Sequence, residues 1–342
     1  MAALTCILMF IFLTACRNEE RTIREFWAEF VGMAGTAGLL GRTVLYIVDD
    51  FSTDGTTALL EEMQTESSGV DLRIIRAPTN LGNQGAMFHG LRRVEIGAQD
   101  VLVTFDSDGE DDVNQMPSIL EMSLQNPGKA VLIERGRRRE SLLFKLFFAT
   151  YKLIFRYFTR QTVVPNNFML LPGTLVPVIQ RSPLAAVHLA YAILKLRPPY
   201  VATVCDRRSR YGGKSSQNIF MLVSHGLVGL MLFFEVVVAK IFVLLFVFGL
   251  FTASIIVLAV ALPVEQVVAH NILLATVMAA AAGAVGLIGL LLSAASALML
   301  KLISFMLAEF AVDRQEGVTR QREGAASVRH DARRERFDRG AS

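Results

Sequence analysis

The feature that most constrains this sequence is an abrupt change in composition near residue 220. Charged residues are frequent up to about Arg210, whereas long apolar runs dominate after Leu222. About twenty consecutive apolar residues are enough for a helix to cross the hydrocarbon core of a bilayer. We therefore expect a soluble domain at 1–220, a membrane segment at 221–305 and a separate tail at 306–342.

The membrane segment is predicted to contain a juxtamembrane helix and two transmembrane helices, at about 239–262 and 271–303. The short connector between them has no Lys or Arg, whereas basic residues flank the pair on both sides. By the positive-inside rule, the helices form a hairpin with both ends in the cytoplasm. This predicts an integral membrane protein, in a bacterial inner membrane, with its soluble domain and C-terminus cytoplasmic. The alternative is two buried helices of a soluble protein.

Small residues are frequent in the second apolar stretch, which suits close helix packing in lipid and allows a homo-oligomer. The Arg-rich tail is predicted to be disordered or to touch the membrane surface. A net charge of +3 gives no basis for nucleic-acid binding. The cysteines, Cys6, Cys16 and Cys205, are too scattered for a disulfide framework or a zinc site, and they favour a reducing compartment.

Strand-like and helix-like segments alternate through the soluble part. The expected strands are Leu4–Ala15, Thr43–Val48, Leu72–Arg76 and Val101–Phe105. The expected helices are Asn18–Phe30, Thr56–Thr65 and a segment that ends at Arg93. This order predicts an α/β domain with a mainly parallel sheet. The segment that ends at Cys16 also resembles a lipoprotein cleavage box, but no Lys or Arg precedes it, which favours the strand.

A further helix is expected at about 141–160, where Phe, Leu, Tyr and Lys have amphipathic spacing. Such a helix can lie along a membrane surface or pack on the domain.

Acidic residues follow two of the predicted strands. Asp49 and Asp50 end the second, and Asp106-Ser107-Asp108 follows the fourth. In parallel sheets, ligands bind beyond the carboxyl ends of the strands. Mg²⁺ and Mn²⁺ prefer oxygen ligands, typically one or two carboxylates together with substrate phosphates. An acidic turn alone is a common surface feature, but its place after a buried strand favours a metal and diphosphate site.

Several segments together resemble the family 2 inverting glycosyltransferases, which have the Rossmann-like GT-A fold. Val48–Thr56 resembles their VDDGSTDGT segment, Asn80–Ala86 their next strand-to-helix turn, and Asp106–Asp108 their DxD motif. Arg17–Glu20 resembles the end of PVYNEE. The regions Arg135–Ser141 and Arg210–Ser215 resemble polyprenol-phosphate sugar transferases, including dolichol-phosphate mannose synthase. The resemblance covers about residues 4–305.

The resemblance implies a role for each matching residue. The nucleotide pocket would be lined by Ala15, Arg17, Glu19, Val48 and Asp50. The diphosphate and an Mg²⁺ or Mn²⁺ ion would be held by Asp106, Asp108 and Glu110, the last at a position usually held by Gln. The phosphates of donor or acceptor would contact Arg135 and Arg210. Ser216 takes the place of a common Lys, for which Lys214 would compensate.

The implied reaction moves a hexose, with inversion, from a UDP- or GDP-sugar to a polyprenyl phosphate in the membrane. A lipid phosphate has a second pKa of about 6 and needs no strong general base. Many relatives carry Asp before Phe where this chain has Asn167-Phe168, which fits a phosphate acceptor. Two alternatives stay open: a transferase acting on another membrane lipid or a glycan, and a catalytically weak membrane scaffold.

Overall fold

The computed structural model describes most of the chain up to the first long apolar helix. The described residues are 8–136, 142–161, 166–212, 226, 228–261, 275–279, 281–284, 286 and 288–289. The chain divides into two units, 1–298 and 299–342, and every described residue belongs to the first.

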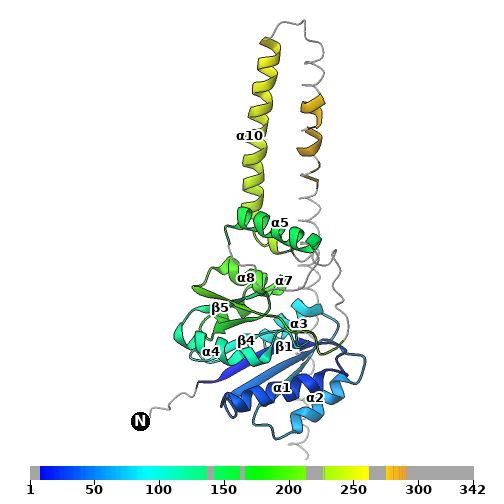
Figure 1. Ribbon diagram of the computed structural model, residues 1–342, viewed down its shortest axis with the longest axis vertical. Coiled ribbons are helices and arrows are strands. Elements are labelled where there is room, and N and C mark those ends of the chain that lie inside the picture. Colours follow the sequence, from blue (N-terminus) through cyan, green and yellow to red (C-terminus); the bar gives the residue numbers. More distant parts are fainter. Residues whose placement is uncertain are drawn as a thin grey trace, which may run out of the picture. The chain divides into compact units, whose positions relative to one another are not determined.

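The centre of the fold is a seven-stranded sheet with the order β3-β2-β1-β4-β6-β5-β7. Its strands β1, β4 and β5 are labelled in Figure 1. The strands are β1 Phe10–Cys16, β2 Thr43–Asp49, β3 Asp71–Arg76, β4 Val101–Thr104, β5 Ala130–Arg135, β6 Met169–Pro172 and β7 Tyr200–Cys205. All neighbours pair in parallel except β6, which runs antiparallel to β4 and to β5. The prediction of a mainly parallel α/β sheet is confirmed, and the mixed sheet fits the expected GT-A fold.

Helices cover both faces of this sheet. The helices are α1 Ile23–Thr36, α2 Thr56–Thr65, α3 Gly82–Leu91, α4 Met116–Gln125, α6 Val176–Gln180, α7 Pro183–Val187 and α8 Leu189–Leu196, with a 3₁₀ turn, η1, at Val113–Gln115. Side chains of α1, α2 and α4 share one hydrophobic core with alternate strand residues such as Phe12. On the other face, α3 lies against β1 and β2. A Cβ atom at Gly90 would lie 2.4 Å from Val48 Cγ2 and 2.7 Å from Leu13 Cδ1, so this close contact requires glycine.

The N-terminal part differs from the prediction in its boundaries, since the strand expected at Leu4–Ala15 begins at Phe10 and the helix expected to end at Phe30 continues to Thr36. Residues Phe10–Cys16 form a buried strand, as the strand interpretation expected, and Cys16 is buried at its end. The first helix, however, begins at Ile23, not at Asn18. Asn18 has a left-handed backbone (φ 54°), and its side-chain Oδ1 accepts a hydrogen bond from the Thr53 backbone N–H at 2.8 Å. This bond ties the segment before the helix to the turn after β2.

The predicted amphipathic helix is present as α5, Leu142–Thr159. In its described part, Phe155 is buried against Tyr191 and Phe233. Leu153 and Tyr157 are instead exposed. The helix therefore packs on the domain along one side and leaves an apolar stripe uncovered on the other.

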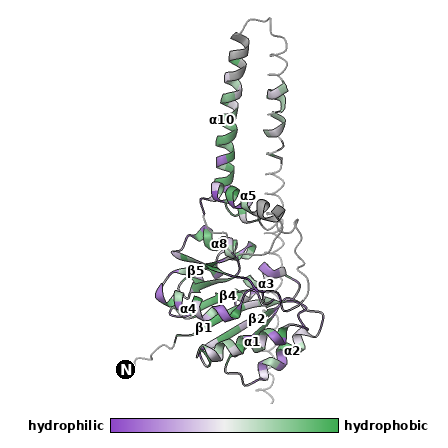
Figure 2. Cartoon of the chain, in the orientation of Figure 1, coloured by the Kyte–Doolittle hydropathy of each residue, from purple (hydrophilic) through white to green (hydrophobic). Residues whose placement is uncertain are grey.

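A long apolar helix, α10, spans Phe234–Ala261. Its stretch Phe234–Ser254 has a mean hydropathy of 2.6 and is long and apolar enough to cross a membrane, judged by length and composition (Figure 2). It begins before the predicted boundary at 239. The connector and most of 271–303 lie outside the described residues, as does the whole tail 306–342, so the hairpin and the tail stay predictions.

Candidate active site

The two acidic segments come together because β2, β1 and β4 are neighbours in the sheet. Asp50 directly follows β2, and Asp106 lies just beyond β4. Residues 106–112, here called the acidic loop, contain five carboxylates. The Ser107 hydroxyl donates to the Ala15 carbonyl at 3.0 Å, which holds this loop against the end of β1. The predicted meeting of these segments at the carboxyl edge of the sheet is confirmed.

Asp50 organises the neighbouring turn. Its carboxylate is buried and accepts a hydrogen bond from the Leu81 backbone N–H at 2.6 Å. Burial raises the pKa of Asp50, and the backbone hydrogen bonds from Leu81 and Gly82, together with the charge of Arg17, oppose that increase. The carboxylate thus fixes the start of α3 beside the site.

Side-chain amides surround Asp106. Its Oδ1 accepts hydrogen bonds from Asn167 Nδ2 at 3.1 Å and from Asn83 Nδ2 at 3.3 Å. Asn167 also donates to Asn83 Oδ1 at 3.0 Å and accepts from Gln84 Nε2 at 2.8 Å. Its side chain is 8% exposed. Asn83 and Gln84 were part of a recognised motif, but no local pattern indicated that they would meet Asp106.

Asp108 faces a cation from a distant part of the chain. Arg210 Nη2 lies 3.0 Å from Asp108 Oδ2, and Arg210 Nε lies 3.4 Å from Glu110 Oε1. Burial raises the pKa of Asp108, as does the nearby charge of Asp106, while the Glu110 backbone N–H and Arg210 oppose this. The arrangement holds the Arg210 guanidinium against the acidic loop.

Glu110, the third predicted metal ligand, is paired with arginines in the structure. Its side chain is 7% exposed and is paired with Arg207 as well as with Arg210. Within the described ranges, no group of three or more His, Cys, Asp or Glu side chains could hold a metal ion. The assignment of Asp106, Asp108 and Glu110 to a metal ion stays a prediction, and in the structure Glu110 is paired with two arginines.

The remaining predicted nucleotide-binding residues lie at the ends of β1 and β2. Arg17 is exposed, Ala15 and Glu19 are half-buried, and the Glu19 carboxylate accepts from the Thr22 hydroxyl. Val48 is fully buried, so its side chain has no surface for a ligand.

Of three further residues predicted to bind substrate phosphates or the nucleotide, the structure describes one in part and two not at all. Arg135 ends β5, and its side chain is outside the description. Lys214 and Ser216 lie outside the described residues altogether.

The two acidic segments of this site lie within a region that matches a known family. Residues 12–178 match the model of the family described as Glycosyl transferase family 2. These residues are a family 2 glycosyltransferase domain. The protein is accordingly a glycosyltransferase, and the matched range contains both acidic segments and the amide cluster around Asp106. No curated protein sequence matches this chain.

Several solved structures resemble the chain at low sequence identity. Mannosyl-3-phosphoglycerate synthase from Rubrobacter xylanophilus is 17% identical, with 68% of this chain and 74% of that chain covered and a TM-score of 0.47. Residues 1–349 of S. aureus TarS are 15% identical, with coverages of 67% and 69% and a TM-score of 0.40. Glucosyl-3-phosphoglycerate synthase from Mycobacterium tuberculosis, crystallised with Mn²⁺ and UDP-glucose, is 16% identical, with coverages of 64% and 76% and a TM-score of 0.43.

The donor set of the glycosyltransferase site fits a divalent cation of the Mg²⁺ type. Asp106 and Asp108 are both partly exposed at the end of a parallel strand, and the charge of Asp106 acts on Asp108. One or two carboxylates are sufficient when substrate phosphates supply the other ligands. Asp106 and Asp108 would supply such carboxylates, whereas Glu110 is engaged by Arg207 and Arg210.

Proposed function

We propose that this glycosyltransferase moves a hexose, with inversion, from a UDP- or GDP-sugar to a polyprenyl phosphate at the cytoplasmic face of a membrane. Asp106 and Asp108 would hold an Mg²⁺ or Mn²⁺ ion, and Arg210 would contact the phosphates of the bound substrates. The cation, when present, neutralises charge on the departing nucleoside diphosphate.

The choice of a phosphate acceptor rests on the side-chain amides of Asn83, Gln84 and Asn167 beside Asp106. A hydroxyl acceptor needs a general base to take its proton, and a carboxylate commonly serves. Here Asn167 occupies the position next to Asp106, and its neutral side chain is held by Asn83 and Gln84. An amide cannot act as such a base, whereas a phosphate dianion needs positioning and no deprotonation.

Two helices support a membrane acceptor. The apolar stretch of α10 is 21 residues long and 11% buried, which is typical of a span and not of a core helix. The exposed stripe of α5, with Leu153 and Tyr157, is flanked by the exposed basic residues Lys152 and Arg156. Such a stripe suits the boundary between headgroups and acyl chains of an anionic membrane.

The full chain in lipid vesicles tests the proposal directly. We would supply polyprenyl phosphate, Mn²⁺ and a panel of UDP- and GDP-hexoses, and measure labelled sugar in the lipid extract. We expect transfer from one donor class to polyprenyl phosphate, with an inverted anomeric configuration by NMR, and none to the matching polyprenol. Transfer to a glycan but not to the lipid phosphate would overturn the acceptor assignment, and no transfer with any donor would favour a scaffold.

Changing Asn167 to Asp tests the role of the amide cluster. The variant loses the donor to Asp106 and places a second carboxylate about one hydrogen-bond length from the first, and like charges at that distance repel. We expect kcat/KM to fall by about 10- to 100-fold, since a broken buried polar contact costs about 1–3 kcal/mol. If the acceptor were instead a hydroxyl group, the new carboxylate could serve as the missing base, and Asn167→Asp would have equal or higher activity than the wild type.

A matched control is Asn126→Asp at the C-terminus of α4, where the amide donates to the Met122 carbonyl of its own helix. It makes the same chemical change at the far end of α4 from the acidic loop, with η1 and α4 between them. Its kcat/KM is expected to stay within about twofold of the wild-type value, as for most surface substitutions.

A further inference from the structure

The segment after β7 runs along the acidic loop. Residues 206–212, here called the basic segment, contain three arginines. The Arg208 backbone N–H donates to the Glu110 carbonyl at 3.2 Å, and that of Tyr211 donates to the Asp108 carbonyl at 3.1 Å. A Cβ atom at Gly109, which has φ +86°, would lie 2.7 Å from the Tyr211 ring. Tyr211 therefore lies directly against the turn that carries Asp108.

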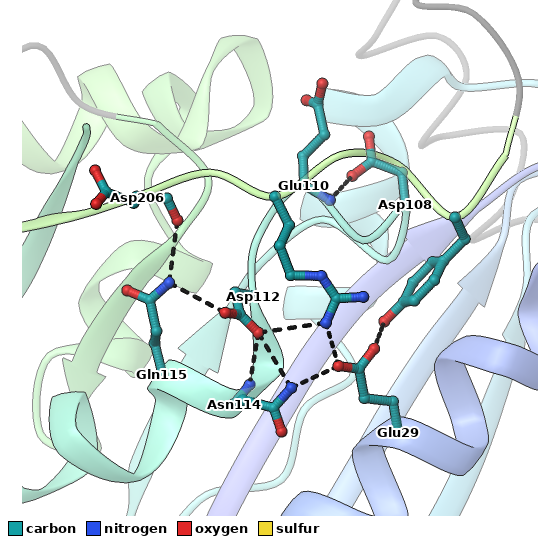
Figure 3. Close-up of polar contacts among 9 residues, drawn as sticks. Glu29, Asp108, Glu110, Asp112, Asn114, Gln115 and Asp206 are labelled. Carbon is teal, nitrogen blue, oxygen red and sulfur yellow. Dashed lines mark hydrogen bonds and ion pairs between the residues drawn. The ribbon is translucent and has the colours of Figure 1, made fainter. Parts of the chain in front are cut away.

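One carboxylate from a different element receives donors from η1 and from the basic segment. Glu29 lies on α1, and its Oε1 accepts from Arg208 Nη1 and from Asn114 Nδ2, the latter at 2.5 Å (Figure 3). Its Oε2 accepts from the Tyr211 hydroxyl. Arg208 also lies 3.6 Å from Asp112 Oδ1 and 5.5 Å above the Tyr211 ring. Glu29 thus joins α1, η1 and the basic segment at one point.

The bonds to Glu29 are of the charge-assisted kind, which are about twice as strong as neutral ones. Burial alone would raise the pKa of Glu29, but the hydrogen bonds from Tyr211 and Arg208 outweigh it, and the pKa is lowered. The side chain is 20% exposed, so solvent screens it only in part. Glu29 is therefore ionised at neutral pH and holds its two donors on the basic segment firmly.

Arg210 lies between the two residues that Glu29 holds. Arg208 precedes it by two positions and Tyr211 follows it directly, and both side chains end on the same carboxylate. These contacts hold the chain on both sides of Arg210, whose Nη2 lies 3.0 Å from Asp108 Oδ2. Fixing a long cationic side chain in advance lowers the entropy cost of binding an anion.

We propose that Glu29 is a positioning residue for the diphosphate site: through Tyr211 and Arg208 it sets the location of Arg210 opposite Asp108. The inference rests on the proposed function, since it takes the acidic loop as the place where a nucleoside diphosphate binds. Glu29 itself touches neither substrate nor the reacting atoms.

The test measures binding of UDP and of GDP, each with Mn²⁺, to the full chain by calorimetry. Glu29→Gln keeps the shape of the side chain but removes its charge, and we expect about tenfold weaker binding, which corresponds to about 1.4 kcal/mol. Tyr211→Phe removes one of the two donors and should give a smaller loss. Glu121→Gln on α4, whose carboxylate meets Gln125 of the same helix, is the matched control and should bind as the wild type does.

The decisive comparison repeats Glu29→Gln in a chain that already carries Arg210→Ala. If Glu29 acts through Arg210, the second change should weaken binding by less than about twofold, because coupled residues are not additive. Hydrogen exchange at 206–212 without nucleotide should rise in Glu29→Gln alone and not in the control.

The outcomes separate the two proposals. An equal loss of nucleotide affinity on adding Glu29→Gln to the wild type and to Arg210→Ala would mean a general structural role and would overturn the inference. Unchanged affinity in Glu29→Gln alone would also overturn it. The same holds if the wild-type protein binds neither nucleotide. Wild-type protein that binds a nucleotide but transfers no sugar to polyprenyl phosphate would overturn the acceptor assignment and leave the role of Glu29 standing.

Discussion

Replacing Asp108 with asparagine is expected to lower kcat/KM for sugar transfer by about 100- to 1,000-fold, the range typical of losing one electrostatic group at a reacting centre. Asparagine retains the side-chain oxygen that accepts from the Glu110 backbone N–H at 2.9 Å, so the acidic loop should keep its conformation. It loses the charge that faces Arg210 and that would help to hold a divalent cation. Initial rates over a range of Mn²⁺ concentrations measure the effect.

The control for this variant is Asp71→Asn at the start of β3. Asp71 is exposed and makes an ion pair of 3.0 Å with Arg73. Exposed pairs contribute at most about 1 kcal/mol to stability, so this change should leave transfer unaltered. If Asp108→Asn transferred sugar as fast as Asp71→Asn, the proposed role of Asp108 would be excluded.

Replacing Phe12 with alanine is expected to lower the free energy of unfolding by about 3–5 kcal/mol, the usual cost of removing a buried phenylalanine ring. Phe12 has no exposed surface and meets Phe30 edge-to-face at a centroid distance of 5.0 Å. It also meets Phe105 at 6.3 Å. Because Phe105 directly precedes Asp106, a cavity here should also loosen the start of the acidic loop. Denaturant unfolding followed by tryptophan fluorescence reports the loss.

Phe51→Ala provides the comparison for the core variant. This ring is 51% exposed and its residue has a left-handed backbone, φ 60°. The substitution removes the same atoms without opening a cavity, so the change in unfolding free energy should stay below about 1 kcal/mol. Similar losses for Phe12→Ala and Phe51→Ala would contradict the packing seen around Phe12.

The first half of the fold could be predicted because its strands are buried runs of β-branched residues that end in acids. Thr43–Val48 and Val101–Phe105 have that pattern, and both lie within one residue of the strands in the structure. A parallel sheet then brings the ends of β2 and β4 to one edge, on either side of β1. Asp50, Asp106 and Asp108 were predicted for this reason.

The second half of the sheet was missed. β6 has only four residues and runs antiparallel between β4 and β5. A repeating strand–helix order in the sequence therefore does not predict it. β7 is partly exposed along its length, and its residues lack the uniformly apolar pattern of the central strands. The pairing of such strands depends on neighbours far along the chain and not on the local sequence.

The ion-pair partners of the basic residues could not be predicted from the sequence either. In the structure, Arg207 pairs with Glu110 and Arg208 with Glu29. Arg208 and Glu29 are 179 positions apart, and Glu29 alone resembles any glutamate on a helix surface. The clustering of arginines is visible in the sequence, whereas the carboxylates that pair with them are identified only by the fold.

The basic segment has a practical consequence for work with fragments of this protein. The region that matches the family ends at residue 178, well before β7 and Arg207. A polypeptide cut at that boundary would retain the five carboxylates of residues 106–112 and lose all three arginines that face them. It would also leave β5 without its partner β7 and so expose a strand edge, a common cause of aggregation. The smallest useful soluble fragment therefore extends at least through Tyr211.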